Sequence, residues 1–290
     1  MQTRQLGPHG PLVGEIGLGC MYLSITDRPS EDDAVRSLEA ALDAGVTFFD
    51  TANAYCLDDA DMGHNERLLA RALHGRKEKA IVGTKGGLRR PGGAWTRDAR
   101  PAELRSACEA SLKALAVEQI DLYQLHAPDP KVPFAESIGA LAKLREEGKI
   151  HYVGLSNVSV AEIEIACAIT PIASVQNRWN ATDRTPETDG VLALCAKLGL
   201  AFLPYSPFGG ARGARSLEKV GRLGAEAKKR AVSPHRLVLA WMLAKSPVVV
   251  AIPGARRIES IRDCMEAAQL KLSATDIEEI ERSFRGAEAC

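Results

Sequence analysis

Several features that would narrow the class of a protein at once are missing from this 290-residue chain. Its 37 basic and 37 acidic residues cancel, so no net field favours nucleic acid or an anionic membrane as a partner. No window is apolar for long enough to span a bilayer, and residues 1–10 contain no apolar core of a secretory signal. We therefore expect a cytoplasmic protein that binds neither nucleic acid nor membrane.

Paired cysteines and a nucleotide fingerprint are missing as well. The seven cysteines include no C-x-x-C pair, which disfavours a disulfide framework and a zinc site. We expect free thiols in a reducing compartment and no bound metal. Residues 14–19 read GEIGLG rather than G-x-G-x-x-G, and no clear helix follows them. A doubly wound dinucleotide-binding sheet is therefore disfavoured.

The sequence does contain a regular alternation of short apolar runs with stretches of helical length, which is typical of βαβ units and a parallel sheet. Eight runs are predicted as strands: Glu15–Leu18, Val46–Phe49, Ala80–Thr84, Ile120–Leu125, His151–Leu155, Ala173–Gln176, Ala201–Pro204 and Val248–Ile252. Eight helices are predicted between and after them: Ala34–Ala44, Glu66–Leu73, Pro101–Leu115, Pro133–Glu147, Ser159–Ala168, Glu187–Leu198, Pro234–Ala244 and Ile258–Ala267.

Eight strand and helix pairs in roughly 250 residues predict an α/β fold, a single (β/α)8 TIM barrel domain that spans residues 1–290. Residues Thr3–Val13 are predicted to form an N-terminal β-hairpin that could close the barrel floor. Two accessory helices are expected, one near Ser216–Arg230 and one after Ser273.

Reactive side chains stand where the predicted strands end. Asp50 and Tyr55 follow the second run, Lys85 follows the third and His126 follows the fourth. Taken singly, each has an ordinary reading as a turn residue, a packing tyrosine, a solvated lysine or an interior histidine. Because barrel active sites lie at the carboxyl ends of the strands, their shared placement favours a catalytic group.

Such a group suits the reduction of a carbonyl, which needs a hydride and a proton. A tyrosine phenol has a pKa of about 10, and a neighbouring ammonium lowers it. A carboxylate beside the lysine keeps the lysine charged and oriented. A neutral histidine can donate a hydrogen bond that polarises the carbonyl.

Five segments, in order along the chain, resemble motifs of the aldo-keto reductase family. They read VTFFDTANAY at 46–55, IDLYQLH at 120–126, HYVGLSN at 151–157, PYSPF at 204–208 and IPGA at 252–255. The resemblance extends over about residues 5–272. It implies a (β/α)8 barrel that transfers a hydride reversibly between NADPH and a small-molecule carbonyl or alcohol.

The resemblance also implies roles for individual residues. Tyr55 would be the general acid and base, Lys85 and Asp50 would tune it, and His126 would orient the carbonyl. The implied NADPH-binding residues are Gly19, Cys20, Met21, Asp50, Ser156, Asn157, Gln176, Tyr205, Ser206, Pro207, Phe208, Gly209, Gly210, Gly254, Arg256, Arg257, Arg262 and Asp263. Among these, Arg256 and Arg257 would meet the 2′-phosphate that distinguishes NADPH from NADH.

The substrate pocket is predicted to be open, because the chain ends soon after the last helix. Tyr22, Trp95, His126 and Trp179 are its predicted lining, which favours small and especially aromatic aldehydes. The segments VQNRWN at 175–180 and PFGG at 207–210 look similar to pyridoxal-reducing members of the family. Two positions depart from the family pattern: Cys56 replaces a common glycine, and Cys264 replaces an asparagine near the adenine.

Two other functions remain open from the sequence. A barrel aldolase could use Lys85 to form a Schiff base, but Tyr55 and the loop after Tyr205 would then have no role. A regulatory protein of the same fold could bind NADPH and turn over slowly, as potassium-channel β-subunits do. The presence of all four catalytic residues favours an enzyme, and the oligomeric state stays open.

Overall fold

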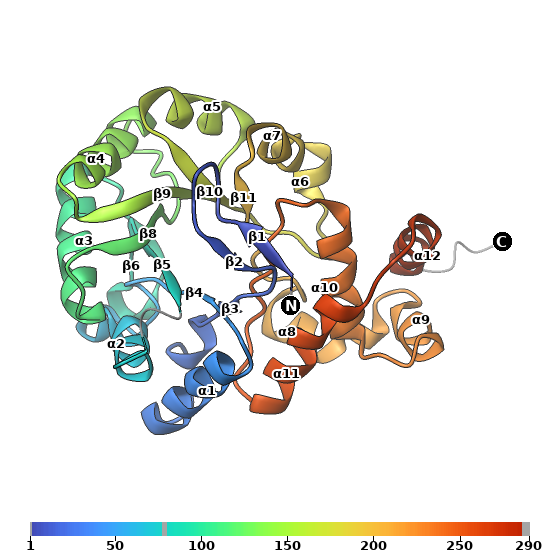
Figure 1. Cartoon of the computed structure of the whole chain (residues 1–290). Helices are drawn as coiled ribbons and strands as arrows, with labels where there is room; N and C mark the ends of the chain where they lie inside the picture. Colours follow the sequence, from blue (N-terminus) through green and yellow to red (C-terminus); the bar gives the residue numbers. More distant parts are fainter. Residues whose placement is uncertain (1, 77–79, 286–290) are drawn as a thin grey trace.

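The computed structural model describes residues 2–76 and 80–285. Its centre is a curled parallel sheet of seven strands in the order β11-β10-β9-β8-β5-β4-β3 (Figure 1). The strands are β3 Leu18–Gly19, β4 Phe48–Asp50, β5 Ile81–Gly86, β8 Ile120–Leu125, β9 Ile150–Ser156, β10 Ile172–Gln176 and β11 Ala201–Phe202. Seven of the eight predicted runs therefore contain a strand or its beginning.

The eighth predicted run, Val248–Ile252, does not form a regular strand, which corrects that prediction. It makes isolated parallel bridges instead, from Val249 to Phe202 and from Ala251 to Ile16. A further bridge joins Gly254 to Gly19. Residues 249–254 thus bond to β11 on one side and to the chain around β3 on the other.

Helices surround the outer face of the sheet (Figure 1). Those that match the predicted helices are α1 Glu31–Asp43, α2 His64–Ala72, α3 Pro101–Leu115, α4 Phe134–Glu146, α5 Val160–Ile169, α7 Val191–Leu198, α10 Pro234–Lys245 and α11 Ile258–Glu266. The first of these begins after Ser30, whose hydroxyl accepts a hydrogen bond from the Asp33 backbone N–H. This cap satisfies one of the free N–H groups of the first turn.

Two predicted helices are each divided in the structure. Glu187–Leu198 becomes α6 Thr185–Thr188 and α7, with Gly190 at φ 89° between them. Ser216–Arg230 becomes a short 3-10 helix at Leu217–Lys219 and α9 Leu223–Lys229, with Gly221 at φ 50° between them, while α8 Gly210–Ser216 ends where the predicted helix begins. A positive φ is accessible to glycine at little cost and ends a right-handed helix. The last accessory helix, α12 Ala274–Phe284, follows Ser273 as predicted.

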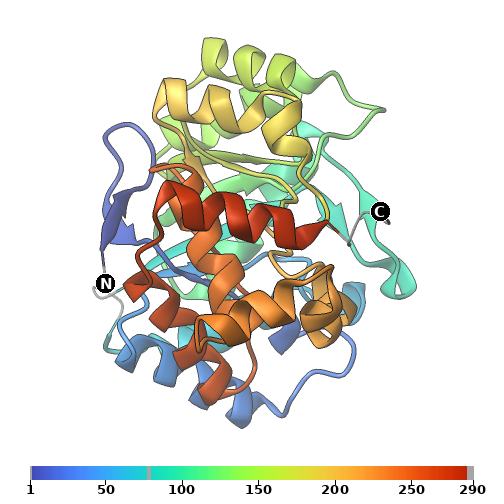
Figure 2. The ribbon, with the colours of Figure 1, turned by 90° about the vertical axis from the view of Figure 1, so that its right-hand side faces the viewer.

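Two hairpins lie at opposite ends of the molecule (Figure 2). The predicted one joins β1 Thr3–Gln5 to β2 Leu12–Gly14. Its Leu6 and Val13 are fully buried in one cluster with Phe48 and Leu122 of the sheet, so it covers that end of the core. The second hairpin, β6 Leu88–Arg89 with β7 Thr96–Arg97, was not predicted because its strands have two residues each.

Strand alternation decides which side chains face the centre of the curled sheet. Phe48 packs in the inner cluster, whereas Phe49 packs in the cluster shared with the helices. Because side chains along a strand alternate between faces, Asp50 points inward with Phe48. The same alternation turns Lys85 inward and its neighbour Thr84 outward toward α2.

The outward Thr84 donates a hydrogen bond to the Glu66 carboxyl at 2.5 Å. Glu66 is fully buried on α2. Burial raises its pKa to about 7, although the hydrogen bond from Thr84 works in the opposite direction. An acid whose folded-state pKa is raised stabilises the fold below its unfolded pKa, and this stability is lost as the pH rises through the folded value.

We expect the melting temperature of the wild type to fall between about pH 4.5 and pH 7 more steeply than that of Glu66→Gln, which cannot ionise. Thermal unfolding followed by circular dichroism across this range measures the difference. Glu164→Gln, at an exposed position of α5, is the matched control and should track the wild type. Parallel curves for all three proteins would contradict the account of Glu66.

Candidate active site

A buried lysine joins the predicted catalytic residues into one group. The Lys85 ammonium donates to the Asp50 carboxylate at 2.7 Å, to the Tyr55 hydroxyl at 3.0 Å and to the Thr51 carbonyl at 2.8 Å. Lys85 has no exposed surface, and Asp50 and Tyr55 are 3% and 6% exposed. The strand ends of β4 and β5 supply Asp50 and Lys85, and the turn after β4 supplies Tyr55.

The second carboxylate oxygen of Asp50 is held from two further strands. Gln176 of β10 donates to it at 2.8 Å, and Gln124 of β8 donates at 3.2 Å. Asp50 therefore accepts from two amides and one ammonium, which fixes the carboxylate toward Lys85. Gln124 was not predicted, although it stands two positions before His126 and so shares the inward face of its strand.

Burial and mutual contact set the protonation of this group. The Asp50 carboxylate and Tyr55 outweigh the effect of burial on Lys85, so the lysine pKa is raised above its ordinary value. Burial raises the pKa of Tyr55 to about 12, although the Lys85 charge works to lower it. The phenol is therefore protonated, and the lysine charged, throughout the neutral range.

His126 stands beside the tyrosine at the end of β8. The two ring centroids are 5.7 Å apart and the planes nearly perpendicular. Burial, assisted by the Lys85 charge, holds the pKa of His126 well below its ordinary value. The imidazole is thus neutral near pH 7, and its Nδ1 has no hydrogen-bond partner in the part of the chain that the structure describes. A neutral ring suits donation to a carbonyl oxygen.

A cleft of about 400 Å³ opens above these side chains. The predicted residues that line it are Gly19, Met21, Tyr22, Asp50, Tyr55, Trp95, His126, Ser156, Asn157, Gln176, Tyr205, Ser206, Pro207, Phe208, Gly210 and Gly254. Leu88, Ala214 and Ile252 line it as well and were not predicted. The cleft therefore brings together residues from most of the strand ends.

The loops around the cleft have a constrained backbone. Asn157 and Ser206 adopt φ values of 60° and 52°, a region that non-glycine residues enter rarely. The Asn157 amide donates to the His126 carbonyl at 2.9 Å and accepts from the Tyr205 hydroxyl at 2.8 Å. The Tyr22 ring packs so close to Gly254 that an added Cβ there would lie 2.8 Å from it.

Six predicted cofactor residues do not line the cleft: Cys20, Gly209, Arg256, Arg257, Arg262 and Asp263. Arg256 donates to the Asp27 carbonyl at 2.5 Å, and Arg257 is exposed at the N-cap of α11. The Asp263 carboxylate is engaged by Ser233 and Arg236.

Trp179 is the one predicted substrate residue that the structure corrects. It is fully buried, packs against Trp241 and Phe202, and donates from its indole N–H to Glu187. It follows β10 in the sequence, but its side chain turns into the core because the large apolar ring finds both packing and a hydrogen-bond partner there. It therefore offers no surface to a ligand in the cleft.

The fold and the buried group agree with comparisons to known proteins. The sequence model of the Aldo/keto reductase family matches residues 15–284. A probable aldo-keto reductase of Glycine max is 36% identical, over 97% of this chain and 88% of that protein. An uncharacterized oxidoreductase of Schizosaccharomyces pombe is also 36% identical, over 91% of this chain and 84% of that protein. The chain belongs to the aldo-keto reductase family.

A solved structure is similar over the whole chain. It is an aldo/keto reductase from Klebsiella pneumoniae in complex with NADP and acetate, 26% identical, with a TM-score of 0.83 over 100% of this chain and 98% of that one. The likeness extends the family assignment to the arrangement of the entire fold.

The geometry predicts a severe effect for Lys85→Met. The substitution removes the positive charge that stabilises the buried Tyr55 phenolate, and it leaves the Asp50 carboxylate without its cation. We expect carbonyl reduction to fall by roughly 10²-fold or more, the size of a lost acid–base function. The measurement is NADPH consumption with a simple aldehyde. Lys149→Met, at a partly exposed surface lysine, should keep wild-type activity. A folded Lys85→Met protein with near-wild-type kcat would refute this role.

Proposed function

We propose that this protein is an NADPH-dependent oxidoreductase that reduces aldehydes and ketones to alcohols and catalyses the reverse oxidation. The observation that carries the proposal is the Lys85 ammonium, which contacts both the Asp50 carboxylate and the Tyr55 hydroxyl on the floor of a cleft. His126 at the same cleft completes a group that can place a proton on a carbonyl oxygen.

In this mechanism the Tyr55 hydroxyl is the proton donor. Its raised pKa keeps it protonated, as a reductase requires. When the carbonyl oxygen gains negative charge, Tyr55 gives up its proton, and the adjacent Lys85 ammonium stabilises the phenolate that forms. Asp50 keeps Lys85 charged and in place, and neutral His126 polarises the carbonyl. NADPH, when bound, supplies the hydride.

The residues of the cleft fit a dinucleotide. Gly210 and Gly254 have no side chain where two loops face the cleft, and Tyr205 offers an aromatic ring. Asn157, Ser156 and Gln176 line the cleft with amide and hydroxyl groups. The Klebsiella reductase of the same fold was solved with NADP. We therefore infer that Ser156, Asn157, Gln176 and Tyr205 would hold the nicotinamide end of NADPH and that the loops after β11 and residue 252 would hold its phosphates.

We also infer that residues 249–254, through isolated bridges rather than a regular strand, close a (β/α)8 barrel at the position of its eighth strand. Their parallel bridges to Phe202, Ile16 and Gly19 support closure of the sheet. The whole chain would then be one domain with its site at the carboxyl ends of the strands.

Among the residues that the structure describes, none of the helices has the length and apolar character needed for a membrane span.

An aldolase mechanism is disfavoured by the state of Lys85. A Schiff base forms from a neutral, reactive amine, whereas this lysine is held charged by Asp50 and its pKa is raised. All three of its hydrogen atoms have acceptors in Asp50, Thr51 and Tyr55.

The substrate is expected to be a small aldehyde, with aromatic ones favoured by Trp95 and Tyr22 at the cleft. Trp179 drops out of this expectation because it is buried. Reduction rates for a series of aliphatic and aromatic aldehydes, measured with NADPH, test the breadth of the pocket. No turnover with any of them would contradict the proposed function.

The cofactor preference tests the arginines that precede α11. An arginine adds charge-assisted hydrogen bonds to phosphate, each contributing about 1.5–3 kcal/mol. The double variant Arg256→Ala/Arg257→Ala should therefore lower the affinity for NADPH by roughly tenfold or more. Its affinity for NADH should stay almost unchanged. Titration of protein fluorescence with each cofactor measures the affinities.

Arg282→Ala, at an exposed position of α12, is the control and should bind both cofactors as the wild type does. Equal affinity of the unmodified protein for NADPH and NADH would overturn the assignment of these two arginines.

A further inference from the structure

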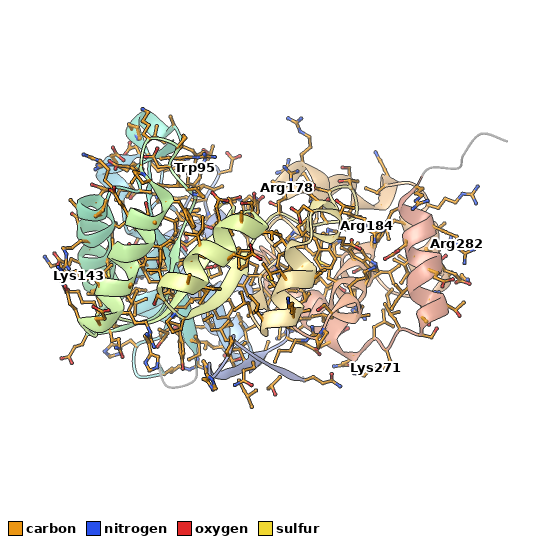
Figure 3. All side chains as sticks on the ribbon, turned by 90° about the horizontal axis from the view of Figure 1, so that it is seen from above. Trp95, Lys143, Arg178, Arg184, Lys271 and Arg282 are labelled. Atoms are coloured by element: carbon orange, nitrogen blue, oxygen red, sulfur yellow. The ribbon has the colours of Figure 1, made fainter. Side chains whose placement is uncertain are left out.

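Trp95 forms one wall of the space above the catalytic residues. It lies on the hairpin at the end of the molecule opposite β1 and β2 (Figure 3). Its ring centroid is 6.4 Å from that of Tyr55 and 6.3 Å from that of His126, and both contacts are edge-on. The residue is 46% exposed and lines the cleft. An indole in this position is within reach of any carbonyl compound that contacts Tyr55.

An arginine covers one face of this indole ring. The Arg90 guanidinium carbon lies 3.9 Å from the Trp95 ring centroid. Arg90 is only 4% exposed, and its Nε has no hydrogen-bond partner in the described ranges. Its neighbour Arg89 behaves differently, because it forms ion pairs with Asp59 and Glu103. The indole face of Trp95 is therefore one of the surfaces that bury the Arg90 guanidinium.

Arg90 also connects the hairpin to the loop that carries the catalytic tyrosine. Its guanidinium donates to the Leu57 carbonyl at 3.4 Å, and its backbone N–H donates to the Asp59 carboxylate at 2.7 Å. Leu57 stands two residues after Tyr55. One side chain thus spans the space between the two loops whose aromatic rings meet at the cleft.

From this geometry we propose that Arg90 is a positioning residue for substrate specificity, which holds the Trp95 indole upright as the aromatic wall of the substrate pocket. The guanidinium covers one face of the ring, so a planar substrate in the cleft would stack on the other face. A cation over an indole is a strong contact when it is shielded from water, and a fixed ring loses less entropy when a ligand stacks on it. The inference rests on the proposed function, since it names the preferred substrates of that site as aromatic aldehydes.

A first experiment tests the stacking without reference to activity. Trp95 is exposed, whereas Trp179 and Trp241 are fully buried, so acrylamide quenching of tryptophan fluorescence reports mainly on Trp95. Arg90→Met should increase the quenching constant because the second face of the ring becomes accessible. Arg90→Lys, which keeps the charge but not the planar group, should also increase it.

The matched control is Arg89→Met, which removes the neighbouring arginine and should leave the quenching constant unchanged. Trp95→Phe supplies the background from the two buried tryptophans. Equal quenching in the wild type and in folded Arg90→Met and Arg90→Lys proteins would overturn the proposed stacking.

A second experiment tests the consequence for the substrate. With 4-nitrobenzaldehyde, Arg90→Met should raise KM by about 3–30-fold, the range of a lost cation–π contact. Its kcat should stay within about twofold, because the proton-donating group is untouched. KM for propanal should change little, and the effect on the aromatic aldehyde should disappear in a Trp95→Ala background.

The two ideas can fail separately. A wild type that reduces no aldehyde would contradict the proposed function. The affinity for 4-nitrobenzaldehyde, measured by tryptophan quenching, would then test Arg90 alone, and equal affinity in the wild type and Arg90→Met would contradict its role. An active enzyme in which Arg90→Met lowers kcat without changing KM, or changes both aldehydes equally, would contradict the positioning role.

Discussion

The ion pair between Lys85 and Asp50 is the contact on which the rest of the site depends. A lysine with no exposed surface would lose its charge by desolvation unless a partner compensated it. Asp50 supplies that compensation at 2.7 Å, and Gln176 and Gln124 hold Asp50 in turn. In the proposed mechanism, the retained charge stabilises the phenolate that forms when the Tyr55 hydroxyl, 3.0 Å away, gives up its proton.

The curled sheet makes this arrangement possible. Inward-facing positions of neighbouring parallel strands converge at the carboxyl ends, so residues far apart in sequence meet without long loops. The apolar cluster around Phe48 and Leu122 fills the same interior below them. Water is thereby excluded from one side of the charged group, which strengthens its hydrogen bonds and raises the pKa of Tyr55. The apolar interior and the grouping of the charged side chains above it both follow from the same alternation along each strand.

Much of this could be predicted from the sequence, because the signals are local. Apolar runs marked the strands, and polar residues at their ends marked Asp50 and Lys85. Tertiary packing was not readable in the same way. Trp179 follows a strand like its neighbours in the cleft, yet it is buried against Trp241. No pattern marked Arg90, since its proposed role depends on contact with a ring five positions away on a short hairpin.

The pKa of Tyr55 shows a similar limit. The sequence suggested that a neighbouring ammonium would lower it, and the lysine does act in that direction, but burial outweighs it. The balance between these effects depends on exposed area, which no motif records. In the same way, Val248–Ile252 forms isolated bridges to Phe202 and Ile16 instead of the expected strand. This pairing depends on two distant parts of the chain, which the local apolar pattern does not record.

The central claim is that Tyr55 delivers the proton when a carbonyl is reduced. Single-turnover oxidation of NADPH by an aromatic aldehyde, followed by absorbance in wild type and Tyr55→Phe, tests it most directly. The account predicts that the variant binds NADPH as the wild type does and reacts roughly 10²–10⁴-fold more slowly. A Tyr55→Phe protein that transfers hydride at the wild-type rate would contradict it.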